Sequence, residues 1–139
     1  MKKKVAEYLI DIIQNQFLMF SIATEFKDPF IYGYINGLIR GKLLEDDIED
    51  DKIRWFIEEK IFNHFYGKKL ANEIINDKDF NENLSLHPKK EDKKERLFLK
   101  GLHSGLEEIK NLHNKKKPLG VYNYLVKKWK NLSSLLASH

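Results

Sequence analysis

The chain has 139 residues, of which 42% are hydrophobic and 33% charged; its formal net charge is +4, with seven glycines, three prolines and no cysteine. This composition is typical of one globular domain and too hydrophobic for a wholly disordered chain. The lack of cysteine excludes disulfides, zinc–thiolate sites and cysteine nucleophiles, and it favours a reducing compartment. We therefore expect a single helical domain over residues 1–139, located in the cytoplasm.

The first predicted element is a helix over residues 3–26. Its apolar side chains recur three and four positions apart through five turns, which is the spacing of an amphipathic helix. The sequence starts with a basic stretch, but Glu7, Asp11 and Gln14 interrupt the apolar run that follows. We therefore expect neither a signal peptide nor a membrane span.

The second element, residues 29–44, follows Asp28-Pro29, a pair typical of an N-cap and a proline in the first helical turn. As a helix it is apolar on nearly every side, so we predict that it is buried at the centre of the fold. Each glycine inside a helix lowers its stability by roughly 1 kcal/mol relative to alanine. We therefore expect a compensating contact that the missing side chains make possible. We predict a close helix crossing at the glycines of residues 29–44 and of a later helix: Gly33, Gly37, Gly41, Gly101 and Gly105.

Two other interpretations of the stretch "YGYINGLIRG" compete with the helix. Asn36-Gly37 flanked by alternating apolar residues is typical of a hairpin, but a lone two-stranded hairpin is marginal in water and no other segment resembles a strand. We favour the helix and keep the hairpin as the alternative. A phosphate-binding loop is disfavoured, because the glycine spacing matches no such motif and Gly41-Lys42 precedes a leucine.

An acidic run precedes the third predicted helix, which ends at Gly67. We expect Asp46 or Asp47 to cap this helix, and the rest of the run to be solvated. A functional alternative is the docking of a basic partner. Six carboxylates in seven positions are the candidate contacts for such a partner: Glu45, Asp46, Asp47, Glu49, Asp50 and Asp51.

Beyond a short fourth helix near Leu70, residues 76–95 are predicted to form a polar loop or hinge, because they contain a proline and lack periodicity in their first half. Helical periodicity returns from about Lys89 to Asn114 and again from Pro118 to Leu136. The sequence thus predicts an all-α bundle of five or six helices.

The charge is divided unevenly along the chain. Residues 1–86 have 12 basic and 16 acidic side chains, a net charge of −4, whereas residues 87–139 have 13 basic and 5 acidic ones, a net charge of +8. Lysine clusters of this kind can neutralise phosphates, so residues 87–130 are a candidate polyanion surface. Its candidate contacts are Lys89, Lys90, Lys93, Lys94, Arg96, Lys115, Lys116, Lys117, Lys127, Lys128 and Lys130.

We find no spacing that predicts catalysis or a cofactor. None of the five histidines forms a His-Glu-x-x-His pair, and adjacent glutamates on a helix point in different directions. The first hypothesis is therefore a non-catalytic protein-binding or assembly module, with self-association as one form of it. A nucleic-acid-associated protein is second and an enzyme third. No cofactor, metal or membrane contact is expected.

Overall fold

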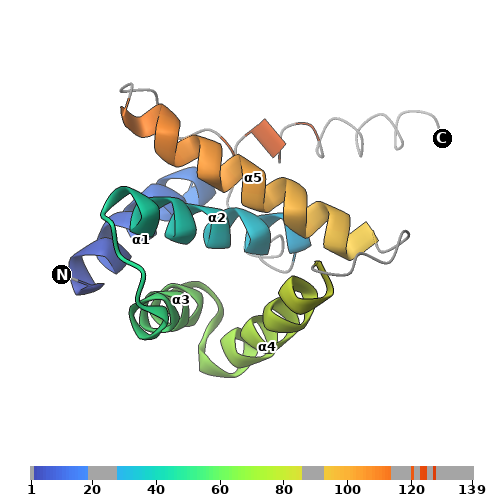
Figure 1. Ribbon diagram of the computed structural model, residues 1–139. Coiled ribbons are helices and arrows are strands. Elements are labelled where there is room, and N and C mark those ends of the chain that lie inside the picture. Colours follow the sequence, from blue (N-terminus) through green and yellow to red (C-terminus); the bar gives the residue numbers. More distant parts are fainter. Residues whose placement is uncertain are drawn as a thin grey trace.

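The computed structural model describes residues 2–18, 28–85, 93–113, 120, 123, 124 and 127. Within these residues it has five helices and no strand, so the predicted all-α fold is confirmed and the hairpin alternative is wrong (Figure 1). In chain order the helices are α1 (Lys2–Leu18), α2 (Pro29–Glu45), α3 (Asp51–Tyr66), α4 (Lys68–Ser85) and α5 (Lys93–His113).

Helix α2 is the central element, as its all-round apolar sequence predicts. The Asp28 side chain caps it by accepting a hydrogen bond from the Phe30 N–H at 2.9 Å, with Pro29 in the first turn. Helix α2 contacts α1, α3 and α5, and its contact with α5 is the most extensive in the bundle. In Figure 1 the two helices lie side by side, and the colours show that they run in the same direction.

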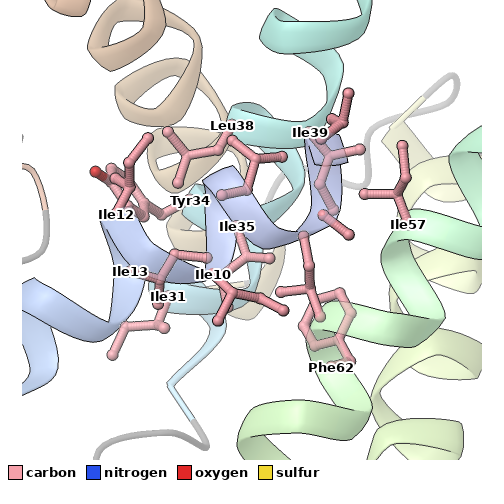
Figure 2. Packing of buried hydrophobic residues seen from close by; sticks show 14 of the residues in the cluster. Ile10, Ile12, Ile13, Ile31, Tyr34, Ile35, Leu38, Ile39, Ile57 and Phe62 are labelled. Atoms are coloured by element: carbon pink, nitrogen blue, oxygen red, sulfur yellow. The ribbon is translucent and has the colours of Figure 1, made fainter. Parts of the chain in front are cut away.

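The hydrophobic core forms where α1, α2 and α3 meet. Isoleucines supply most of it, and Figure 2 shows Ile13 from α1, Ile35 from α2 and Ile57 from α3 as parts of this cluster. Their side chains are fully buried, as is the ring of Phe62. Burying an apolar side chain of this size stabilises a fold by about 1.5–3 kcal/mol, so this cluster fixes α1 and α3 against α2.

The N-cap of α3 is Asp50, which corrects the prediction of Asp46 or Asp47. The Asp50 side chain accepts a hydrogen bond from the Lys52 N–H at 2.8 Å. Asp46 instead ends α2, and Asp47 has the left-handed φ of 55° that closes a helix C-terminus. The acidic run therefore connects the end of α2 to the start of α3.

We expect Asp50→Ala to lower the free energy of unfolding by about 1 kcal/mol, because the first turn of α3 loses its capping acceptor. Glu49→Ala is the matched control. Glu49 is exposed, and this substitution removes the same charge from the neighbouring position. Urea unfolding followed by circular dichroism measures both variants. Equal destabilisation by the two substitutions would contradict the assignment of the cap.

Helix α4 is longer than the sequence predicts. It begins after Gly67, whose φ of 80° ends α3, and it continues to Ser85 through the first half of the predicted loop 76–95. Residues 68–85 contain neither proline nor glycine, so nothing interrupts the backbone hydrogen bonds even where the apolar periodicity ends. Residues 86–92 lie outside the described part of the chain, and α5 begins at Lys93.

The predicted final helix, 118–136, falls mostly outside the described residues. Gly120, Asn123, Tyr124 and Lys127 are described and are helical. Among the described residues, no helix combines the length and the apolar character that crossing a membrane requires.

Candidate functional site

The glycines of α2 and α5 bring the two backbones into direct contact. A Cβ atom added at Gly33 would overlap the carbonyl group of Phe98, and one at Gly101 would lie 2.8 Å from the Tyr34 backbone nitrogen. At Gly37 the added atom would lie 3.0 Å from the Gly105 Cα. A side chain at any of these positions would therefore force the helices apart.

The third glycine of α2 has a different environment. A Cβ at Gly41 would meet the side chain of Ile109, with Cγ1 at 3.0 Å, and no backbone atom is among its nearest neighbours. A side chain can adjust where a backbone cannot. The crossing is therefore tightest at Gly33 and Gly37, in the second and third turns of α2, and looser at Gly41.

A buried polar network crosses the same interface. The Tyr34 hydroxyl donates to a Glu108 carboxylate oxygen at 2.8 Å and accepts from the Gln16 side-chain amide at 2.9 Å. The Gly120 N–H donates to the same carboxylate oxygen at 2.7 Å. Tyr34, Gln16 and Glu108 are 0%, 2% and 6% exposed, so this network joins α1, α2 and α5 inside the protein.

Two tyrosines of the structure are held in the protonated form. Burial raises the pKa of Tyr34 far above its ordinary value of 10.0, and the negative charge of Glu108 raises it further. Burial likewise raises the pKa of Tyr66, with smaller contributions from Tyr32 and Asp28. A protonated Tyr34 is the form that donates to Glu108, so the network keeps its hydrogen bonds throughout the neutral range.

We expect the free energy of unfolding to be insensitive to these tyrosines below pH 10 and to fall above it. The unfolded chain then loses phenolic protons that the folded chain retains, which favours unfolding by up to about 1.4 kcal/mol per pH unit for each tyrosine. Tyr34→Phe should make this alkaline decline shallower. Urea unfolding at pH 8, 10 and 11 measures the slope, and an unchanged slope in the variant would contradict the burial of that hydroxyl.

The C-terminal part of the chain is attached to the crossing at two described points. Besides the Gly120 contact, the Tyr124 hydroxyl donates to the second oxygen of Asp28, and the Tyr124 ring stacks on Phe30 with centroids 3.9 Å apart. Asp28 therefore caps α2 with one oxygen and holds Tyr124 with the other. These contacts place Lys127, which is exposed, three residues beyond an anchored ring.

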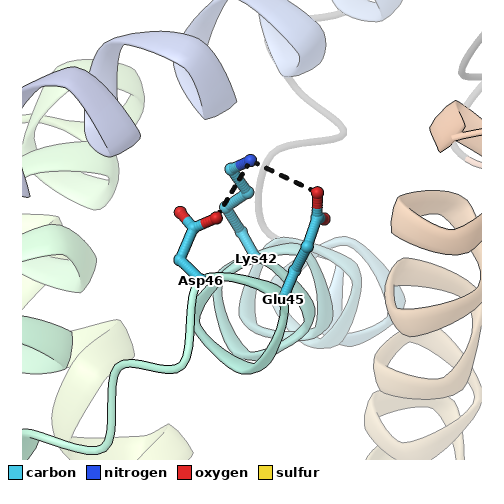
Figure 3. A network of polar contacts seen from close by, with 3 residues as sticks. All are labelled: Lys42, Glu45 and Asp46. Carbon is cyan, nitrogen blue, oxygen red and sulfur yellow. Dashed lines mark ion pairs between the residues drawn. The ribbon is translucent and has the colours of Figure 1, made fainter.

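The acidic candidates lie in and beside one exposed turn between α2 and α3, which we call the acidic turn: Glu45 is the last residue of α2 and Asp51 the first of α3. Lys42 lies 3.6 Å from Glu45 and 3.5 Å from Asp46, as Figure 3 shows, and this cation offsets two carboxylates at the negative end of α2. Arg54 lies 3.7 Å from Asp51. Residues 45–51 contain six carboxylates and no basic side chain, so this segment has a negative formal charge beside the two cations that pair with it.

A groove of about 220 Å³ lies beside this turn. Leu44, one of the residues that line it, is 70% exposed. Apolar residues line the groove together with acidic and basic ones: Leu43, Leu44, Ile48, Glu49, Asp50, Asp51, Arg40 and Arg54. The arrangement offers apolar contact next to charge, which is the composition of many protein-binding surfaces.

Few of the basic candidates lie among the described residues. Arg96 on α5 is exposed, and so are Lys100, Lys110 and Lys127. Lys93 and Lys94 form the first turn of α5. The remaining candidates lie outside the described residues: Lys89, Lys90, Lys115, Lys116, Lys117, Lys128 and Lys130.

The sequence analysis did not predict that Trp55 is exposed or that Glu58 is buried. Trp55 is 56% exposed on α3, whereas Glu58 is only 2% exposed. The position of Trp55 outside the apolar stripe of Ile53, Ile57 and Ile61 could have predicted its exposure. No periodic pattern predicts a buried glutamate, because the burial of Glu58 depends on how α4 packs against α3.

Comparisons with protein-family models, with curated proteins and with solved structures found no match to this chain. Within the described residues, no group of three or more histidine, cysteine, aspartate or glutamate side chains is arranged to hold a metal ion.

Proposed function

We propose that this protein is a non-catalytic protein-binding module that uses the acidic turn and its groove to dock a basic partner in the cytoplasm. The observation that carries the proposal is the 70% exposed Leu44 at a groove next to six carboxylates. An exposed apolar residue beside concentrated charge supports docking, because charge steers the encounter and apolar contact retains the partner.

Affinity capture of the chain from its native host, with and without nuclease, tests this function. A specific partner should be retained after nuclease treatment and lost with Leu44→Lys, which removes the apolar contact and adds repulsion. Gln14→Lys is the matched control, because it adds the same charge at an exposed position of α1. Equal capture by wild type and Leu44→Lys would contradict docking at this groove.

The alternative function is that of a nucleic-acid-associated protein. The exposed side chains of Arg96, Lys100, Lys110 and Lys127, together with the net charge of +8 over residues 87–139, support it. Binding through phosphate contacts weakens steeply with salt. A titration of fluorescent DNA and RNA at 50 mM and 200 mM salt tests the alternative, and no binding at 50 mM would exclude it.

A further inference from the structure

A second groove, of about 280 Å³, lies between α3 and α4. Trp55, Glu58 and Glu59 line it from α3, and Asn72 and Ile75 line it from α4. The sequence spacing explains this geometry, since residues three and four positions after Trp55 lie on the same side of α3. Asn72 and Ile75 are likewise three apart, so the facing side of α4 closes the groove.

The groove has the chemistry of a site for an organic cation. Two of its lining side chains are carboxylates and none is lysine, arginine or histidine. An anion would therefore meet repulsion in it. Trp55 is 56% exposed and offers an indole face, the aromatic surface that attracts a cation most strongly. Ile75 and the Trp55 ring also provide apolar surface for the aliphatic stem of a long side chain.

We propose that this groove binds the protonated side chain of a lysine or arginine on a basic segment of a partner protein. The inference rests on the proposed function and names the partner's chemistry. Charge complementarity selects this occupant, because the acidic turn and the groove carboxylates both lie on or next to α3. The six carboxylates of residues 45–51 end at the first residue of α3, one turn before Trp55. A segment with several lysines or arginines can place one cation at the acidic turn and another in the groove.

The emission of Trp55 reports on occupancy. The chain has two tryptophans, so Trp129→Phe leaves Trp55 as the single indole. An acetylated and amidated tetralysine peptide is the probe. We expect a saturable change in Trp55 emission with this peptide and none with its twin, in which every lysine is Nε-acetylated and uncharged. Calorimetric titration of the wild-type chain should rank the two peptides in the same order.

Two carboxylate variants separate a built site from general charge attraction. Glu59→Gln should weaken tetralysine binding about threefold to tenfold, because one exposed carboxylate facing the cation is lost. Glu73→Gln is the matched control; it removes the same charge from an exposed position of α4 that does not line the groove. It should change the affinity less than twofold. Trp55→Ala should abolish the binding that calorimetry measures.

Several results would overturn the proposal. These are the absence of a saturable change, equal weakening by the two glutamine variants, or a stronger response to single-stranded DNA than to tetralysine. A Trp55 signal that depends on protein concentration alone would instead identify a second copy of the chain as the occupant. If Leu44→Lys abolishes capture of the partner but tetralysine does not bind, this inference is wrong, whereas the proposed function is still supported.

Discussion

Gly37→Ala is expected to destabilise the protein by about 1–3 kcal/mol, although alanine is the better helix former. The added methyl would overlap the carbonyl group of Leu102 and lie 3.0 Å from the Gly105 Cα. Overpacking against backbone atoms costs more than the roughly 1 kcal/mol that a helix gains from replacing glycine with alanine. Urea unfolding of the variant and the wild type measures the difference.

Gly41→Ala is the matched control for this prediction. It makes the same chemical change on the same helix, but the new methyl meets the side chain of Ile109, which can adjust. We expect its free energy of unfolding to lie within about 1 kcal/mol of the wild type, because the gain in helix propensity offsets the tighter packing. A Gly37→Ala protein that is more stable than the wild type would contradict the close approach of α2 and α5.

Glu108→Ala is expected to lower the free energy of unfolding by about 2–4 kcal/mol. The substitution removes the acceptor of two hydrogen bonds, from the buried Tyr34 hydroxyl and from the Gly120 N–H. Each buried donor left without an acceptor costs about 1–3 kcal/mol. Thermal unfolding and urea unfolding should both show the loss.

Glu107→Ala provides the control, because Glu107 is exposed and carries the same charge one position earlier on α5. Its effect should lie within about 0.5 kcal/mol, the usual range for surface substitutions. If the two variants were equally stable, the Tyr34–Glu108 hydrogen bond would not contribute to the fold.

The sequence predicts the elements that local chemistry determines. Asp28-Pro29 begins α2, Gly67 ends α3, and the apolar spacing places Ile13 and Ile57 in the core. Each of these features depends on neighbours within one or two turns. Local patterns therefore defined the fold class and the buried position of α2.

The features that the sequence did not predict depend on contacts between distant segments, or on the absence of a proline or glycine that would interrupt a helix. The hydrogen bond between Tyr34 and Glu108 joins residues 74 positions apart, and no local pattern indicates such a pairing. The extension of α4 to Ser85 was missed because the sequence there has no apolar stripe, although it also contains no proline or glycine that would interrupt a helix. Asp50 was missed as a cap because six carboxylates in one run offer several equivalent capping residues.

The parallel pairing of α2 and α5 has a consequence for the order of folding. All of α3 and α4 separates these two helices in the chain, so the largest interface of the bundle joins segments that are synthesised far apart in time. Helical proteins usually fold through local contacts, and non-local pairing slows the search for the native state. A nascent chain that ends before Lys93 has its central helix but not the partner for its glycine face. Completion of the core therefore waits for α5.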